Sequence, residues 1–168
     1  MKYYFEYFPY LVAKYLKFLL ATIEDFENNI IKSSIKNQII EPIFISGCPR
    51  SGTTILTHLI SKTENIGCFQ YEDIPFIHNL YLWNKINKLF YAGLKEKERV
   101  HGDSLKVGPK SPDSFEELFW FKNLSNHKEN FYKILDEKFN EEKILDRYVF
   151  FISKMLYIKK KKEILIKK

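Results

Sequence analysis

The sequence predicts an α/β domain in which helices pack on both faces of a short parallel sheet and so form three layers. Short apolar runs rich in β-branched or aromatic residues occur at 43–45, 66–71 and 163–166. Segments with helical spacing of apolar residues lie between these runs, and a glycine-containing loop at 47–52 joins the first run directly to a helix. Strands that alternate with helices are typical of a parallel sheet.

The composition is that of one globular domain. The chain has 168 residues, of which 45% are apolar and 17% aromatic, and this is enough to build a single core. We expect one domain over residues 1–168, with an N-terminal helical segment at 1–40 and an α/β core at 41–168.

Charge and cysteine content argue against several classes of protein. The net charge is +6, but the last ten residues hold six lysines and one glutamate, so the rest is nearly neutral and no nucleic-acid partner is expected. Cys48 and Cys68 are too few for a disulfide scaffold, which favours reduced thiols in a cytoplasmic protein. The four histidines show no ligand spacing, so we expect no metal.

The aromatic N-terminus leaves two alternatives. Its longest uncharged stretch, residues 7–13, is far too short to cross a bilayer. Residues 1–23 fit either an interfacial helix on a membrane surface or a helix packed on the domain, and we favour the packed helix.

The predicted helices share apolar residues at three- and four-residue spacing: 3–34, 53–63, 74–90, a helix starting at Ser111–Pro112, 128–138 and 141–160. Pro75 interrupts the third of them in its first turn, and Ser111 is the expected N-cap of the fourth. We expect the terminal strand at an edge of the sheet, left open because the domain is incomplete at its C-terminus.

The loop between the first strand and the first core helix has the chemistry of an anion site. Backbone N–H groups at a helix start, together with the helix dipole, attract phosphate, and glycine lets the backbone curl around it. Gly47 and Gly52 have the spacing of a nucleotide-binding P-loop, with Thr54 at the Ser/Thr position. Thr53 stands where that loop carries its lysine, and the cation is instead Arg50, whose guanidinium suits a bidentate contact to phosphate or sulfate.

Residues 42–54, with Pro-Arg-Ser-Gly-Thr-Thr at 49–54, resemble the 5′-phosphosulfate-binding loop of sulfotransferases. The resemblance implies a P-loop-like fold, 3′-phosphoadenylyl sulfate as sulfuryl donor, and a hydroxyl acceptor on a small molecule or carbohydrate. Arg50 would contact the phosphosulfate, and Gly47 and Pro49 would complete the donor-binding loop. The resemblance also implies which residues hold the 5′-phosphate: Ser51, Gly52, Thr53 and Thr54.

The base that takes the acceptor proton is expected to be Glu72. It follows the second strand, as the base glutamate does in the tyrosylprotein and heparan sulfotransferases that the loop resembles, and its apolar neighbours would raise its pKa. The alternative is that Glu72 or Asp73 only caps the next helix. His78 and His101 are the next candidates for the base.

Two groups of lysines leave alternatives open. Lys110 before Ser111 could present a second cation to the ligand, although a solvated lysine at a helix start is favoured. Residues 159–162 are all lysine and could bind an acidic acceptor or lipid, although a solvated helix end is favoured.

The sequence also departs from the sulfotransferases. Their 3′-phosphate motif, a strand followed by arginine and then serine, is not found, so the resemblance covers an amino-terminal portion of the family's fold. Two other functions therefore stay open. One is a P-loop nucleotide kinase or nucleoside triphosphatase, and the other is a truncated, non-catalytic binding module.

Overall fold

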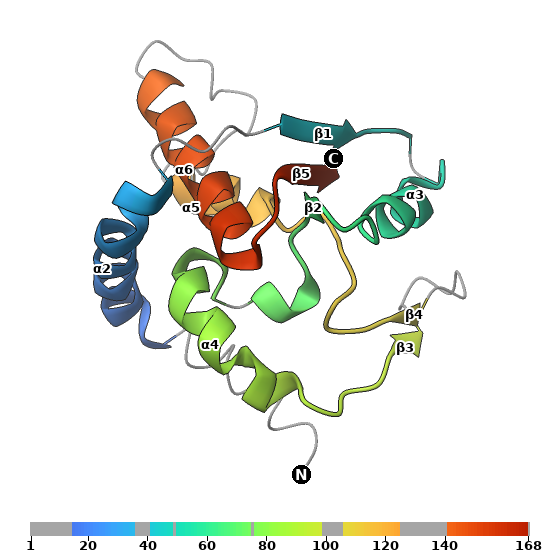
Figure 1. Ribbon diagram of the computed structural model, residues 1–168, viewed down its shortest axis with the longest axis horizontal. Coiled ribbons are helices and arrows are strands. Elements are labelled where there is room, and N and C mark those ends of the chain that lie inside the picture. The colour runs from blue at the N-terminus through green and yellow to red at the C-terminus, as the bar shows by residue number, and fades with distance from the viewer. Residues whose placement is uncertain are drawn as a thin grey trace.

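The computed structural model describes residues 15–35, 41–48, 50–74, 76–98, 106–124 and 141–167 (Figure 1). The predicted helix at 128–138, the start of the helical segment, Pro49 and His101 lie outside the described residues. What is described is a small α/β fold, as predicted.

Three parallel strands form the sheet. They are β1 (Glu41–Ile45), β2 (Ile66–Gly67) and β5 (Glu163–Lys167), in the order β1-β5-β2 (Figure 1). The terminal strand is therefore central, and its prediction as an edge strand was wrong. Residues 164–166 of this strand are 0%, 3% and 1% exposed, so both of its faces are buried. A continuously apolar strand is typical of a position where both faces of a sheet are covered.

The two faces of β5 belong to two separate parts of the core. Ile164 and Ile166 pack in a cluster with α6 (Glu141–Lys159), whereas Leu165 packs with Ile45, Ile66 and Cys68 on the side of α3 (Thr53–Ile60). Because successive side chains of a strand point to opposite faces, α6 and α3 cover opposite faces. Each face of the short parallel sheet is thus covered by a helix.

The remaining helices surround α6. They are α2 (Lys17–Ile35), α4 (Leu80–Tyr91) and α5 (Glu117–Leu124). Two 3-10 turns, Tyr71–Asp73 and Ile77–Asn79, connect β2 to α4. A short antiparallel hairpin of β3 (Lys97–Glu98) and β4 (Lys106–Val107) follows.

The second strand and the helix after it differ from their predicted bounds. The strand ends at Gly67 and the chain continues to an isolated bridge at Gln70, while α4 begins at Leu80. Ile74 is extended, as expected for a residue before proline, so the helix cannot begin there.

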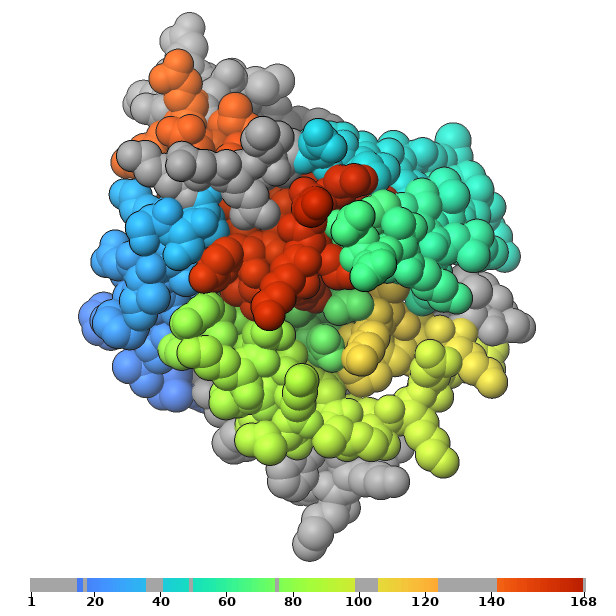
Figure 2. All heavy atoms as spheres, in the orientation of Figure 1, coloured from blue at the N-terminus to red at the C-terminus, as the bar shows by residue number. Residues whose placement is uncertain are grey.

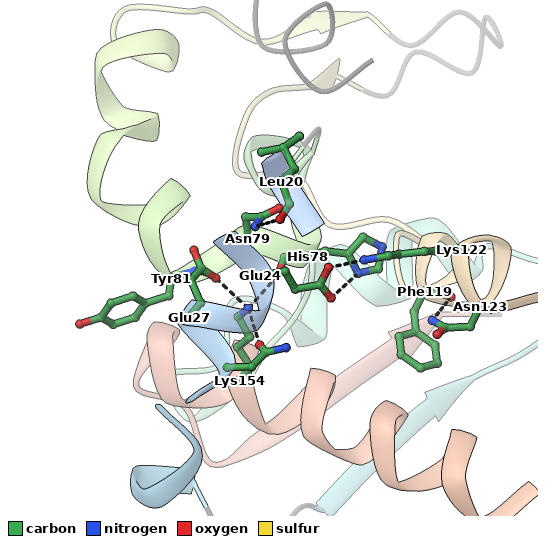
Figure 3. Close-up of polar contacts among 11 residues, drawn as sticks. Leu20, Glu24, Glu27, His78, Asn79, Tyr81, Phe119, Lys122, Asn123 and Lys154 are labelled. Atoms are coloured by element: carbon green, nitrogen blue, oxygen red, sulfur yellow. Dashed lines mark hydrogen bonds and ion pairs between the residues drawn. The ribbon is translucent and has the colours of Figure 1, made fainter. Parts of the chain in front are cut away.

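A buried ion pair joins three of these helices (Figure 3). Glu27 of α2 is fully buried and lies 2.8 Å from the ammonium of Lys154 on α6. The same carboxylate accepts the N–H of Leu82 at 2.8 Å in the first turn of α4. Lys154 also donates to Asn28 and to the His78 carbonyl. The pair therefore fixes α2 against both α4 and α6.

None of the helices in the described ranges is both long enough and apolar enough to cross a membrane.

Candidate functional site

The loop after β1 is tightly curled. A Cβ added to Gly47 would lie 2.5 Å from the Ser51 hydroxyl oxygen and 3.0 Å from a methyl of Thr53, so a larger residue would force the Ser51 side chain to shift. The N–H of Ser51 donates to the Cys48 carbonyl at 3.1 Å and closes the turn. The chain therefore folds back on itself, as a backbone cradle requires.

Two residues of this loop have left-handed backbone. Arg50 has φ of 67° and Gly52 has φ of 84°. A side chain in this region is uncommon, and such strain clusters at binding sites. The Arg50 side chain is exposed, and Gly52 is the N-cap of α3, where it provides no side-chain capping hydrogen bond. The predicted cation and helix start thus lie together.

A second cationic group reaches the loop from the sheet. Lys167 ends β5, which pairs with β1, and its Nζ donates to the Thr54 hydroxyl at 3.0 Å and lies 2.6 Å from a carboxylate oxygen of Asp113. Its side chain is only 11% exposed. Sequence reasoning missed Lys167. The available signal was its place at the carboxyl end of a strand, because the carboxyl ends of parallel strands meet at one edge.

Asp113 connects Lys167 to the segment that carries the predicted base, Glu72. The Tyr71 hydroxyl donates to its second carboxylate oxygen at 3.3 Å, and Tyr71 immediately precedes Glu72. Because β1 and β2 both run parallel to β5, the predicted donor loop and the predicted base follow strands that end at the same edge of the sheet.

The two neighbouring carboxylates, Glu72 and Asp73, have different environments. Asp73 is buried, accepts the N–H of Gln70 at 2.8 Å in a capping box, and pairs with Lys159 at 2.6 Å. The capping role considered for either residue belongs to Asp73. No hydrogen bond to the Glu72 carboxylate is present in the part of the chain that the structure describes. Burial raises the pKa of Glu72, and the ammonium of Lys159 opposes that rise.

Glu72 lines a cleft of about 710 Å³. The cleft lies between α4, the turn at 108–112 and the end of α3, and Figure 2 shows the gold segment that begins at β4 facing the yellow-green end of α4 across this hollow. Among the described residues, those of the loop at 47–54 do not line it. The loop and the cleft are therefore adjoining sites, linked through Lys167, Asp113 and Tyr71.

The turn at 108–112 differs from its prediction. Ser111 does not cap a helix, because α5 begins only at Glu117. Its hydroxyl instead accepts the N–H of Gly108 at 2.9 Å, and Pro112 forms an antiparallel bridge with Gln70. The Ser111 hydroxyl, which was expected to cap a helix, therefore closes this turn instead. Lys110, within the turn, lines the cleft.

The run of lysines at 159–162 is not simply a solvated helix end. Lys159 donates to Asp73, to Gln70 and to the Cys68 carbonyl, and Lys161 donates to the Glu64 carbonyl. Lys159 therefore holds the segment after β2 against the end of α6.

Two further titratable groups lie away from the expected chemistry. His78 packs among α2, α5 and α6, 3.9 Å from Glu24, and burial lowers its pKa to about 3 (Figure 3). It does not line the cleft of Glu72. Burial raises the pKa of the Cys68 thiol to about 11, which keeps it protonated, whereas Cys48 is exposed in the loop.

Comparison of the chain with protein-family models, curated proteins and solved structures finds no match. Among the described residues, no three His, Cys, Asp or Glu side chains are grouped as metal ligands would be.

Proposed function

We propose that the chain binds a phosphosulfate donor, 3′-phosphoadenylyl sulfate, at the loop of residues 47–54 and transfers its sulfuryl group to a hydroxyl acceptor held in the adjoining cleft. The observation that carries the proposal is the curled loop at the start of α3, with Arg50 in left-handed backbone and Lys167 at its side. Backbone N–H groups, a helix start and two cations form a site for an anion with several oxygens.

The proposed reaction needs few protein groups. The acceptor oxygen attacks sulfur, the bond from sulfur to the bridging phosphate oxygen breaks, and adenosine 3′,5′-bisphosphate leaves. Arg50 stabilises negative charge on the phosphosulfate, and the N–H groups that begin α3 hold the 5′-phosphate. Glu72 takes the acceptor proton, and burial supports this role because it raises the carboxyl pKa towards neutrality.

A nucleotide kinase or nucleoside triphosphatase is less well supported. Such enzymes place a lysine at the position of Thr53 and hold magnesium with an aspartate from the sheet. The strand next to β1 ends in Lys167, whose ammonium group bonds to the Thr54 hydroxyl. The same ammonium pairs with Asp113, so this carboxylate already has a positive partner. A positive group there opposes binding of a second cation.

Both cysteines are free thiols, and one of them is exposed in the loop. This supports the further proposal of a reducing compartment such as the cytoplasm.

Calorimetry with adenosine 3′,5′-bisphosphate tests the donor site. We expect binding without magnesium, weaker binding by Arg50→Ala, and only partial recovery in Arg50→Lys, since an ammonium cannot form the bidentate contact. The matched control is Arg147→Ala, because Arg147 is exposed on α6, away from the loop. Binding of magnesium ATP but not of the bisphosphate would overturn the proposal in favour of a kinase or triphosphatase. Binding of neither would leave the binding-module function.

A further inference from the structure

The face of α4 that lines the cleft is polar. Asn84, Asn87, Lys88 and Tyr91 follow the three- and four-residue spacing of one helix face, and all four line the cleft beside Glu72. The core side of the same helix is formed by buried apolar residues, including Trp83. An amphipathic helix normally turns its polar face to open solvent. The polar face of α4 instead forms one wall of a cleft, which is a position where a ligand can contact it.

Asn87 is the unusual member of this face. Its residue is only 3% exposed, yet no hydrogen bond to its side chain is present in the described ranges of the chain. Among the described residues, no buried side-chain nitrogen or oxygen atom lacks a hydrogen-bond partner, so the amide atoms of Asn87 keep contact with solvent, and the surface that they line is the cleft. Asn84, one helical turn earlier, is half-buried and likewise has no side-chain hydrogen bond among the described residues. Two adjacent amides thus present unused donors and acceptors to the cleft.

The charge around the cleft is positive apart from Glu72 and Glu96. Lys62, Lys88 and Lys110 line it, and Lys110 and Lys88 lie close enough to Glu72 to oppose the rise in its pKa. All three ammonium groups belong to exposed residues at the rim, where a ligand can reach them. The cleft therefore combines the side-chain amides of Asn84 and Asn87 in its wall with cations at its mouth.

We propose that Asn84, Asn87 and Lys88 form the acceptor-binding surface and that the acceptor is an acidic sugar. A side-chain amide donates and accepts at once, which matches neighbouring hydroxyls, and Lys88 matches a carboxylate. A cleft of about 710 Å³ is within the usual range for small-ligand sites. Asn84, Asn87 and Lys88 are positioning residues that present one hydroxyl to Glu72. The inference rests on the proposed function for its reaction, but not for the binding itself.

The test uses the full chain labelled with ¹⁵N and two probes, D-glucuronate and its neutral counterpart D-glucose. Side-chain amide signals of Asn84 and Asn87 should shift on titration with glucuronate. Asn87→Ala should weaken glucuronate binding about tenfold, the scale of one lost hydrogen bond in a buried site. Lys88→Ala should weaken binding of glucuronate but not of glucose.

Matched controls come from the same helix and the same residue type. Lys85→Ala removes a lysine of α4 that does not line the cleft, and Asn65→Ala removes an exposed asparagine outside it, so both should bind glucuronate as the parent does. Asn87→Leu should be at least as resistant to urea as the parent, because no protein partner loses a hydrogen bond. A structural asparagine would instead lose stability on this change.

The outcomes separate this inference from the proposed function. Bisphosphate binding without any glucuronate effect on Asn87 overturns the inference and leaves the donor site standing. Glucuronate binding at Asn87 without bisphosphate binding supports the acceptor surface and overturns the donor site. Loss of stability in Asn87→Leu together with unchanged glucuronate binding also overturns the inference.

Discussion

The ion pair between Glu27 and Lys154 gives the sharpest prediction for the fold. Lys154→Met removes the ammonium 2.8 Å from a carboxylate that is 0% exposed. The neutral methionine fills a similar volume, so the main consequence is a buried carboxylate without its counter-charge. Breaking a buried pair in this way costs about 3–5 kcal/mol of the free energy of unfolding. That is a large fraction of the total stability of a small domain.

A second substitution isolates the charge. In Glu27→Gln/Lys154→Met the amide oxygen can still accept the N–H of Leu82, but no charge is buried. We expect the double variant to lose only about 1–2 kcal/mol, the cost of imperfect hydrogen bonds left at Asn28 and at the His78 carbonyl. Removing the second charge should therefore restore stability to the single variant.

Urea unfolding followed by circular dichroism measures both changes, provided that the slope with urea is unchanged. Lys32→Met is the control, because Lys32 is exposed near the end of α2. A loss below about 1 kcal/mol in Lys154→Met, or a double variant as unstable as the single one, would refute the argument that the buried charge is compensated only by its partner.

Three further predictions concern the site and its pH dependence. Glu72→Gln should retain bisphosphate binding and lower the rate of sulfuryl transfer by about a hundredfold or more. In the parent, turnover should rise with pH through a midpoint above the usual pKa range of glutamate, because burial raises the pKa of Glu72. Full turnover in the variant would exclude Glu72 as the base. Gly47→Ala should weaken bisphosphate binding, because the added Cβ would lie 2.5 Å from the Ser51 hydroxyl, one of the groups expected to hold the 5′-phosphate; binding equal to that of the parent would contradict the tight loop. Burial lowers the pKa of His78 to about 3, so the unfolded chain binds a proton that the folded one does not, and stability should fall below pH 6.5 by up to about 1.4 kcal/mol per pH unit. His78→Gln should remove this slope in urea unfolding between about pH 6.5 and 5, whereas an unchanged slope would assign it to another group.

Local patterns were enough to predict the elements that carry a strong periodicity. The strand at 163–167, the helix that follows the glycine loop and the long helix α6 were each predicted from apolar spacing or β-branched runs, and the structure has them. Their bounds differ by a few residues, as expected where turns at the ends depend on tertiary contacts.

The errors share a physical cause, which is that a side chain had more than one partner available. The Ser111 hydroxyl could cap a helix or close a turn, and contact between the 108–112 segment and Gln70 decided for the turn. Lys159 could extend into solvent, but Asp73 is buried within reach and needs a cation. Gln70 and Asp73 lie far from Ser111 and Lys159 in the sequence, so neither outcome follows from local pattern.

The position of β5 was also beyond local pattern, and it determines the charge of the candidate site. A run such as Ile164–Ile166 fits an edge or a centre equally well until its neighbours are known. Its central place sets Lys167 beside Thr54 rather than in solvent, and Arg50 lies on the same edge. Lys167 at the end of β5 and Arg50 in the loop after β1 then both lie at the edge where α3 begins, and positive charge there has the same sign as the helix dipole. We expect such a site to attract an anion whose negative charge the protein itself balances, and this is what the proposed phosphosulfate donor requires when no metal ion takes part.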